Sequence, residues 1–183
     1  MKTSMSFSEQ PPTTRTLHWN PPKFSFLKVN CDASYDLSSG LTGIALVLRD
    51  HAGTWRGGLV KCYAGKASSE AAKCLAFSHS VRWCVELQLP RIMLEMDLKG
   101  IDSYINKASH TISWENEVIL LDAIETLTKF QAWEVSFVPR KCNKIVDTLA
   151  KYINRFRISK IWLDDPPSNV EAQLLSEKLQ IHD

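Results

Sequence analysis

A chain of 183 residues, 44% hydrophobic and 23% charged, is long enough for one globular domain with a sizeable core and too short for two comfortable ones. Its 22 Lys and Arg against 20 Asp and Glu give a net charge of +2, which excludes both a uniformly cationic nucleic-acid coat and an acidic solvating tail protein. Nucleic-acid binding would therefore require positive charge concentrated in one part of the chain.

No apolar run reaches the length of a membrane span, and residues 1–20 contain no apolar core of the kind found in signal peptides. We therefore expect a soluble, intracellular protein with no membrane partner. The five cysteines are never spaced as C-x-x-C, so the sequence favours buried free thiols over disulfides or a cysteine-rich zinc site. Residues 1–23, rich in Ser, Thr and Pro, are predicted to be a flexible lead-in, from which Trp19 is a candidate to dock on the domain.

The first part of the domain is predicted to be a meander of three antiparallel strands. From residue 24 onward, apolar and polar side chains alternate as in a strand that ends at Asp32. Two β-rich runs follow at 41–50 and 54–65, separated by the turn signal Asp50-His51-Ala52-Gly53. The alternation places Leu27, Val29 and Cys31 on one face of the first strand, and Phe26, Lys28, Asn30 and Asp32 on the other.

Helical patterns and strands alternate in the remainder of the domain. Apolar residues at helical spacing predict a helix over 68–87, with Ser68 or Ser69 as its N-cap. The apolar run at 91–97 predicts a buried strand parallel to the first. The later elements are predicted as a short helix at 98–107, a longer helix at 115–130, a strand at 133–140 and a helix at 144–154 capped by Asn143.

The order of these elements, β-β-β-α-β-α-α-β-α, predicts an α/β fold with a mixed five-stranded sheet flanked by helices. Three strands would be antiparallel and the others parallel. We expect one domain over 24–155, followed by a tail at 156–183 with a short amphipathic helix at 170–179.

Four acids lie where a core-building sequence does not need them: Asp32 ends the first strand, Glu70 opens the long helix, Asp97 ends the fourth strand, and Asp147 lies in the first turns of the last helix. Taken singly, each is explained as a turn former or as an acid that favours a helix N-terminus. Their combination is more informative, because adjacent parallel strands would bring Asp32 and Asp97 to one edge of the sheet within reach of both helix starts. Converging carboxylates repel one another unless cations neutralise them, and such oxygen ligands suit Mg²⁺ or Mn²⁺. Two such ions roughly 4 Å apart are the usual arrangement for phosphodiester hydrolysis.

Five segments carry a family resemblance. KVNCDAS, GIALVLRD-x-x-G, SSEAAKCLA, MLEMD and VPRKCNKIVDTLAK, in this order, resemble the plant ribonuclease H-like domains found alone and at the end of non-LTR retrotransposon polyproteins. The similarity runs from about residue 19 to residue 153. It implies a ribonuclease H fold of retrotransposon descent. It also implies that four acids serve as the family's catalytic metal ligands: Asp32, Glu70, Asp97 and Asp147.

The reaction that the resemblance implies is endonucleolytic cleavage of the RNA strand of an RNA–DNA hybrid, leaving 5′-phosphate and 3′-hydroxyl ends. Two Mg²⁺ or Mn²⁺ ions would activate a water and stabilise the leaving oxygen, with no small-molecule cofactor. Asp32 would bridge both ions, and Glu70 would lie closest to the substrate 2′-hydroxyl. Asp147 is the most easily replaced ligand of such a set. We expect a monomer.

Two positions depart from the family pattern. Ribonucleases H often carry a histidine ten residues before the last aspartate, and here that residue is Phe137, which cannot move protons. Metal-ion chemistry can proceed without the histidine, so we expect a slower enzyme. Lys73 follows Glu70 by one helical turn, and a pairing of the two across the helix surface would mute the acid.

The charge that could hold a nucleic acid is local. Residues 140–160 carry seven cations and one acid, whereas residues 161–183 carry five acids and one cation. Arg140 and Asn143 match the family's R-x-x-N before the last aspartate. The predicted nucleic-acid contacts are Arg140, Lys141, Asn143 and Lys144; the alternatives are a solvated helix face and, for Asn143, a helix cap.

Tryptophan could also bind nucleic acid by stacking, but core packing is expected for three of the four candidates, which are Trp55, Trp83, Trp114 and Trp133. The basic handle that some ribonucleases H use should follow the long helix, where residues 87–91 supply only Arg91. Hybrid affinity is therefore expected to be modest.

The main alternative to an enzyme is a catalytically weak or inactive domesticated retroelement module that binds nucleic acid or protein, as Phe137 and the thin basic handle would allow. A 3′–5′ exonuclease is disfavoured because Ala33 and Ser34 follow Asp32 where D-x-E is expected. An integrase or transposase would need a final glutamate where this chain has Asp147.

Overall fold

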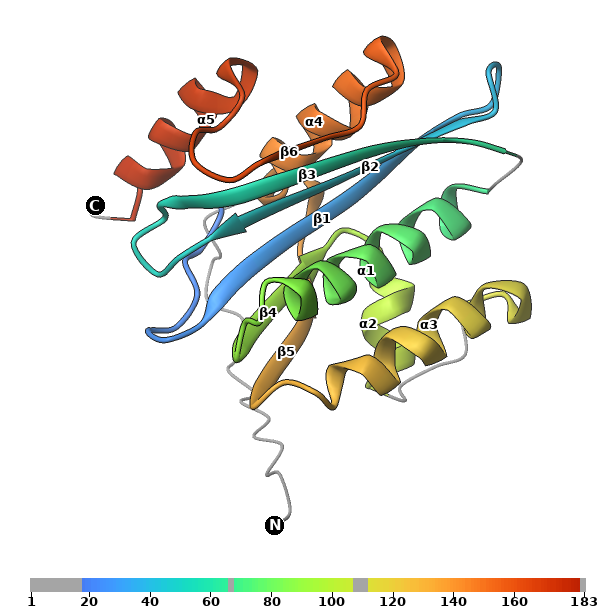
Figure 1. Ribbon diagram of the computed structural model, residues 1–183, viewed down its shortest axis with the longest axis horizontal. Helices are drawn as coiled ribbons and strands as arrows, with labels where there is room; N and C mark the ends of the chain where they lie inside the picture. Colours follow the sequence, from blue (N-terminus) through green and yellow to red (C-terminus); the bar gives the residue numbers. More distant parts are fainter. Residues whose placement is uncertain (1–17, 66–67, 107–111, 182–183) are drawn as a thin grey trace.

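The computed structural model describes residues 18–65, 68–106 and 112–181. Most of the predicted lead-in, residues 1–17, lies outside them. A mixed sheet with the strand order β5-β4-β1-β2-β3-β6 is covered by helices on both faces (Figure 1). The strands are β1 (Leu27–Asp36), β2 (Leu41–Arg49), β3 (Trp55–Ala64), β4 (Arg91–Met96), β5 (Ala132–Phe137) and β6 (Lys160–Trp162). The helices are α1 (Ser69–Glu86), α2 (Lys99–Ile105), α3 (Trp114–Leu127), α4 (Lys144–Phe156) and α5 (Ser168–Leu179), with a 3-10 turn, η1, at Arg140–Cys142.

The predicted order of elements is confirmed, and so is the mixed sheet. β1, β2 and β3 form the antiparallel meander, while β4 runs parallel to β1 and β5 parallel to β4. The count of five strands was wrong by one, because β6 pairs antiparallel with β3 at the far edge. β6 is three residues long and is therefore too short to show the alternation that indicates a strand.

Two hydrophobic clusters lie on opposite faces of the sheet. α1 and α3 cover the face onto which Val29 and Cys31 project, and α4 and α5 cover the other face, against Ala45 and Val47 (Figure 1). The predicted alternation in β1 is therefore confirmed. Ser68 caps α1 as expected, accepting a hydrogen bond from the Ala71 amide at 3.0 Å.

Three of the four tryptophans pack in the core, as expected: Trp55 and Trp83 are buried, Trp133 is half-buried against the first cluster, and Trp114 is 76% exposed. Trp19 docks on the domain, with only 2% of its surface exposed. None of the five cysteines forms a disulfide; Cys31, Cys74 and Cys84 are buried, as expected, whereas Cys62 and Cys142 are half-buried.

The amphipathic stretch near the C-terminus forms α5, which packs on α4 through Val170 and Leu174. Glu177 of α5 also reaches the sheet, where its carboxylate pairs with the Arg49 guanidinium at 2.5 Å. Within the described residues, none of the helices has the length and apolar character needed to cross a membrane.

Candidate active site

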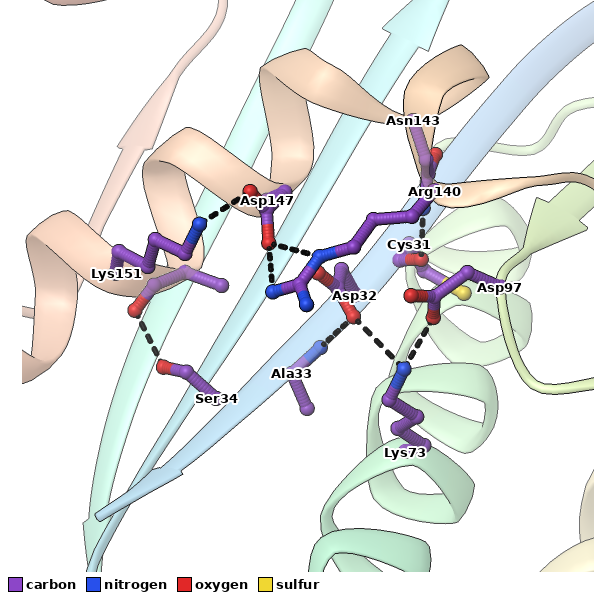
Figure 2. A network of polar contacts seen from close by, with 11 residues as sticks. Cys31, Asp32, Ala33, Ser34, Lys73, Asp97, Arg140, Asn143, Asp147 and Lys151 are labelled. Atoms are coloured by element: carbon purple, nitrogen blue, oxygen red, sulfur yellow. Dashed lines mark hydrogen bonds and ion pairs between the residues drawn. The ribbon is translucent and has the colours of Figure 1, made fainter.

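Three of the four predicted acids, Asp32, Asp97 and Asp147, lie around the point where β1 separates from β4. β1 pairs with β4 only as far as Asn30, opposite Glu95, but it continues alongside β2 to Asp36. Asp32 therefore lies within the strand, whereas the sequence predicted that the strand ends at this residue. Asp97 directly follows the last residue of β4. The divergence of two parallel strands brings Asp32 and Asp97 side by side at an edge that α1 and α4 approach from opposite faces (Figure 2).

Asp32 and Asp97 share one cation, the side chain of Lys73 from α1. The Lys73 Nζ lies 3.6 Å from Asp32 Oδ1 and donates a hydrogen bond to Asp97 Oδ1. The side chains of Asp32, Asp97 and Lys73 are 4%, 10% and 20% exposed, respectively, so the three charges are largely shielded from water. Burial, and then the nearby charge of Asp97, raise the pKa of Asp32 to about 6, although Lys73 acts in the opposite direction.

Asp147, in the first turn of α4, is held by two other cations (Figure 2). Arg140 donates from Nε at 3.0 Å and from Nη2 at 2.6 Å to Asp147 Oδ1, and Lys151 Nζ donates to Oδ2 at 2.6 Å. Burial opposes ionisation of Asp147, but the hydrogen bonds from Lys151 and Arg140 prevail and lower its pKa. Asp147 is close enough to Asp32 for its charge to contribute to the raised pKa of Asp32.

Glu70 binds the start of α3 instead of a cation. Its Oε1 accepts hydrogen bonds from the Ser113 amide at 3.0 Å, the Ser113 hydroxyl at 2.6 Å and Asn116 Nδ2 at 2.7 Å. These bonds, that of the Ser113 hydroxyl above all, lower the pKa of Glu70. The alternative pairing of Lys73 with Glu70 is not formed, because Lys73 lies beside the two aspartates.

The donor chemistry of this site fits a divalent cation, but the arrangement of the side chains does not. Asp32 and Asp97 offer hard carboxylate oxygens, the ligands that Mg²⁺ and Mn²⁺ prefer. However, the Lys73 ammonium already lies where these two carboxylates would share an ion. No three His, Cys, Asp or Glu side chains in the described parts of the chain are grouped so that they could hold a metal ion.

The predicted nucleic-acid contacts differ in exposure. Lys141 and Lys144 are exposed, and 65% of the Arg140 side chain is exposed. Asn143 is 2% exposed, and its Nδ2 donates to the Cys31 carbonyl at 3.0 Å, beside Asp32. Asn143 occupies the N-cap position of α4, but its side chain makes no capping hydrogen bond. Its amide ties the start of α4 to β1 and so positions Arg140 and Asp147.

Phe137 is the last residue of β5 and pairs with Met96, one position before Asp97. The phenyl ring of Phe137 cannot transfer a proton. Of the five histidines, His110 and His182 lie outside the described residues, and His79 of α1 contacts the Tyr63 hydroxyl at 2.7 Å.

Sequence reasoning missed the contacts of Lys73 with the aspartates. A signal was available, because Lys73 precedes the buried Phe77 by four residues and so shares the inward face of α1. A lysine at such a position must find a buried partner, and the aspartates at the strand ends are the acids that this face meets.

The chain belongs to the reverse transcriptase-like family, whose model matches residues 30–153. A relative from Arabidopsis thaliana, named "Putative ribonuclease H protein", is 28% identical over 146 residues, which cover 78% of this chain. This chain spans 23% of the length of that relative.

Solved structures show the same fold at low identity. Ribonuclease H1 from the archaeon Halobacterium salinarum matches with a TM-score of 0.66 at 21% identity, over 72% of this chain and 98% of that chain. LC11-RNase H1, solved in complex with an RNA/DNA hybrid, matches with a TM-score of 0.64 at 13% identity, over 72% of this chain and 99% of that chain. The ribonuclease H fold that the sequence resemblance implied is therefore confirmed.

Proposed function

We propose that this chain binds an RNA–DNA hybrid across the edge that carries Asp32, Asp97 and Asp147, and that it hydrolyses the RNA strand. The observation that carries the proposal is the gathering of three acids from β1, the end of β4 and α4 in a member of this family. The hybrid bound to the similarly folded LC11-RNase H1 supports the choice of substrate.

In this proposal, Asp32 and Asp97 would hold Mg²⁺ or Mn²⁺ once Lys73 has left them, with Asp147 and Glu70 as the further proposed ligands. The chemistry that bound ions supply is a water of lowered pKa and stabilisation of the leaving 3′-oxygen, which yields 5′-phosphate ends. Glu70 accepts a hydrogen bond from the 2′-hydroxyl, the group that distinguishes RNA from DNA. Ser113 and Asn116, its present donors, orient the carboxylate.

The exposed cations beside the acids are the proposed phosphate contacts. Arg140 and Lys141 lie in η1 and Lys144 lies in the first turn of α4, the helix that carries Asp147, and all three side chains are exposed. Phosphate binding needs such local clustering more than a basic total charge. Asn143 supports these contacts because its hydrogen bond to the Cys31 carbonyl holds the start of α4 against β1. We further propose that the chain acts as a monomer of plant retrotransposon descent.

The test is cleavage of a hybrid labelled on its RNA strand, in Mg²⁺ or Mn²⁺, by the wild-type protein and by Asp97→Asn. We expect slow cleavage by the wild type, because Phe137 supplies no proton, and a loss of about a hundredfold or more in Asp97→Asn. Equal rates for the two proteins, or an intact hybrid with both, would reject the proposal. Duplex DNA of the same sequence is the substrate control.

A second candidate function is binding of nucleic acid without cleavage. The observation that favours it is the neutralisation of Asp32, Asp97 and Asp147 by the chain's own cations. Hybrid binding that persists in EDTA, together with no cleavage at any Mn²⁺ concentration, would establish this function instead. Fluorescence anisotropy of a labelled hybrid measures the binding.

A further inference from the structure

We propose that Lys73 is a built-in counterion of the active site, which occupies the place of a divalent cation between Asp32 and Asp97 and must be displaced before an ion can bind. The inference deepens the proposed function and rests on it, since it concerns the same carboxylates. It concerns regulation: Lys73 sets the concentration of divalent ion that the site requires.

The burial of the three side chains is the first support. Asp32 and Asp97 are 4% and 10% exposed, so their charges need compensation from within the protein. Lys73 supplies it to both, at 3.6 Å from Asp32 Oδ1 and by direct hydrogen bonding to Asp97 Oδ1. The Lys73 ammonium thus bridges the two carboxylate groups, as a metal ion shared between them would.

The charge balance of the whole edge is the second support. Asp147 is matched by Arg140 and Lys151, so the three aspartates face three cations of the chain (Figure 2). A divalent ion that entered this balanced group would meet a surplus of positive charge. Arg140 and Lys151 have side chains that are 65% and 61% exposed and can follow the phosphates of a bound nucleic acid. Lys73 is the member enclosed with Asp32 and Asp97.

The form of the lysine side chain makes displacement feasible. Its ammonium is a compact charge on a flexible four-carbon stem, and 20% of the side chain is exposed. Removing one unit charge from within a few ångströms of an ion site is expected to strengthen ion binding by about tenfold or more.

The experiment measures Mn²⁺ binding by calorimetry to the whole chain, without nucleic acid, for the wild type, Lys73→Met and Lys73→Arg. Lys73→Met keeps the length of the side chain and removes its charge, whereas Lys73→Arg keeps the charge. We expect Mn²⁺ to bind Lys73→Met about tenfold or more tightly than the wild type, and Lys73→Arg no more tightly. Lys129→Met, which removes an exposed lysine beyond the end of α3, is the matched control and should bind as the wild type does.

The melting temperature provides a second readout if Lys73→Met folds poorly on its own. The unpaired aspartates should make this variant gain more thermal stability from Mn²⁺ than the wild type gains, and Lys73→Gln serves if Lys73→Met cannot be purified. Adding Asp97→Asn to Lys73→Met should abolish both effects. Equal Mn²⁺ affinity in the wild type and the Lys73 variants would overturn the inference.

The outcomes separate this inference from the proposed function. Tighter Mn²⁺ binding by Lys73→Met, with no cleavage of the hybrid by either protein, would support the counterion and reject the nuclease. Cleavage by the wild type, with Mn²⁺ affinity unchanged by Lys73→Met, would support the nuclease and reject the counterion.

Discussion

Two groups of charged side chains lie on this sheet, and they differ in access to water. The first, around Lys28, Asn30 and Arg49, is sealed: Lys28 pairs with Glu95, Arg49 pairs with Glu177 at 2.5 Å, and the exposed fraction of each side chain in these pairs is below a tenth. Trp19 closes it, donating to Asn30 Oδ1 at 2.8 Å and stacking 3.6 Å from the Arg49 guanidinium.

The second group, around Asp32, Asp97 and Asp147, is open on one side. Asp32 is as buried as the charges of the sealed network, but Arg140 and Lys151 are largely exposed at its margin. Both groups balance acids with cations. Charge balance alone therefore does not distinguish a structural network from a functional one. Exposure of the cations does, because only an exposed cation can exchange its carboxylate partner for a phosphate.

The largest expected effect comes from breaking the sealed network. Glu177→Ala would leave the buried Arg49 guanidinium without its carboxylate, and we expect a loss of about 3–5 kcal/mol in the free energy of unfolding. Urea denaturation measures the loss. Glu171→Ala, at an exposed position on the same helix, is the control. A loss below 1 kcal/mol would show that α5 is not fastened through this pair.

The open group should respond to pH in the metal-free protein. The pKa of Asp32 is raised to about 6 in the folded state, above its unfolded value near 4, so the folded protein holds this proton more tightly. Stability should therefore be lost as pH rises from about 4 through about 6, by about 3 kcal/mol. Asp32→Asn should remove this loss, as measured by urea denaturation in EDTA across that range.

Asp36 is a contrasting control on the same strand. Hydrogen bonds from Ser39 and Ser38 lower the pKa of Asp36 to about 2. Its effect on stability has the opposite sign, since stability is lost as pH falls toward 2. Were Asp32→Asn to leave the slope between pH 4 and 6 unchanged, the buried charge of Asp32 would not govern stability.

Asn143 shares a feature with each of the two groups: it is buried, like the sealed network, but it supports the exposed cations of the open group. Asn143→Ala removes the hydrogen bond to the Cys31 carbonyl, and we expect it to cost about 1–2 kcal/mol in unfolding free energy. We also expect weaker hybrid binding in EDTA, because Arg140 and Lys144 lose their support. Thr148→Ala, an exposed change one turn along α4, should alter neither quantity. Unchanged binding in Asn143→Ala would mean that the start of α4 keeps its place without this tie.

The smallest effect is expected at the exposed margin itself. Lys144→Ala should reduce hybrid affinity by a few-fold and lower the slope of log affinity against log salt by about 1, since one phosphate contact is lost. Fluorescence anisotropy at several salt concentrations measures both. Lys129→Ala, at the end of α3, should leave the slope as it is. An equal effect of the two substitutions would mean that the cations of 140–160 have no special role.

The sequence predicted the parts of the fold that periodicity and strand order determine. Alternation in β1 correctly divided Val29 and Cys31 from Asn30 and Asp32, and the parallel pairing of β1 and β4 brought Asp32 and Asp97 together. β6 was missed because three residues show no period. The partners of Glu70 and Lys73 were missed for another reason. Both side chains bind residues that are distant in the sequence, near the start of α3 and at the end of β4, and the local pattern of α1 does not indicate these contacts.

Single-turnover cleavage of an RNA–DNA hybrid across Mn²⁺ concentrations, by the wild type and by Asp97→Asn, is the decisive measurement of the proposed nuclease activity. We expect slow cleavage of the RNA strand by the wild type, a requirement for high Mn²⁺, and no cleavage by Asp97→Asn. An RNA strand that stays intact with the wild type at every Mn²⁺ concentration, or is cut equally by Asp97→Asn, would contradict it.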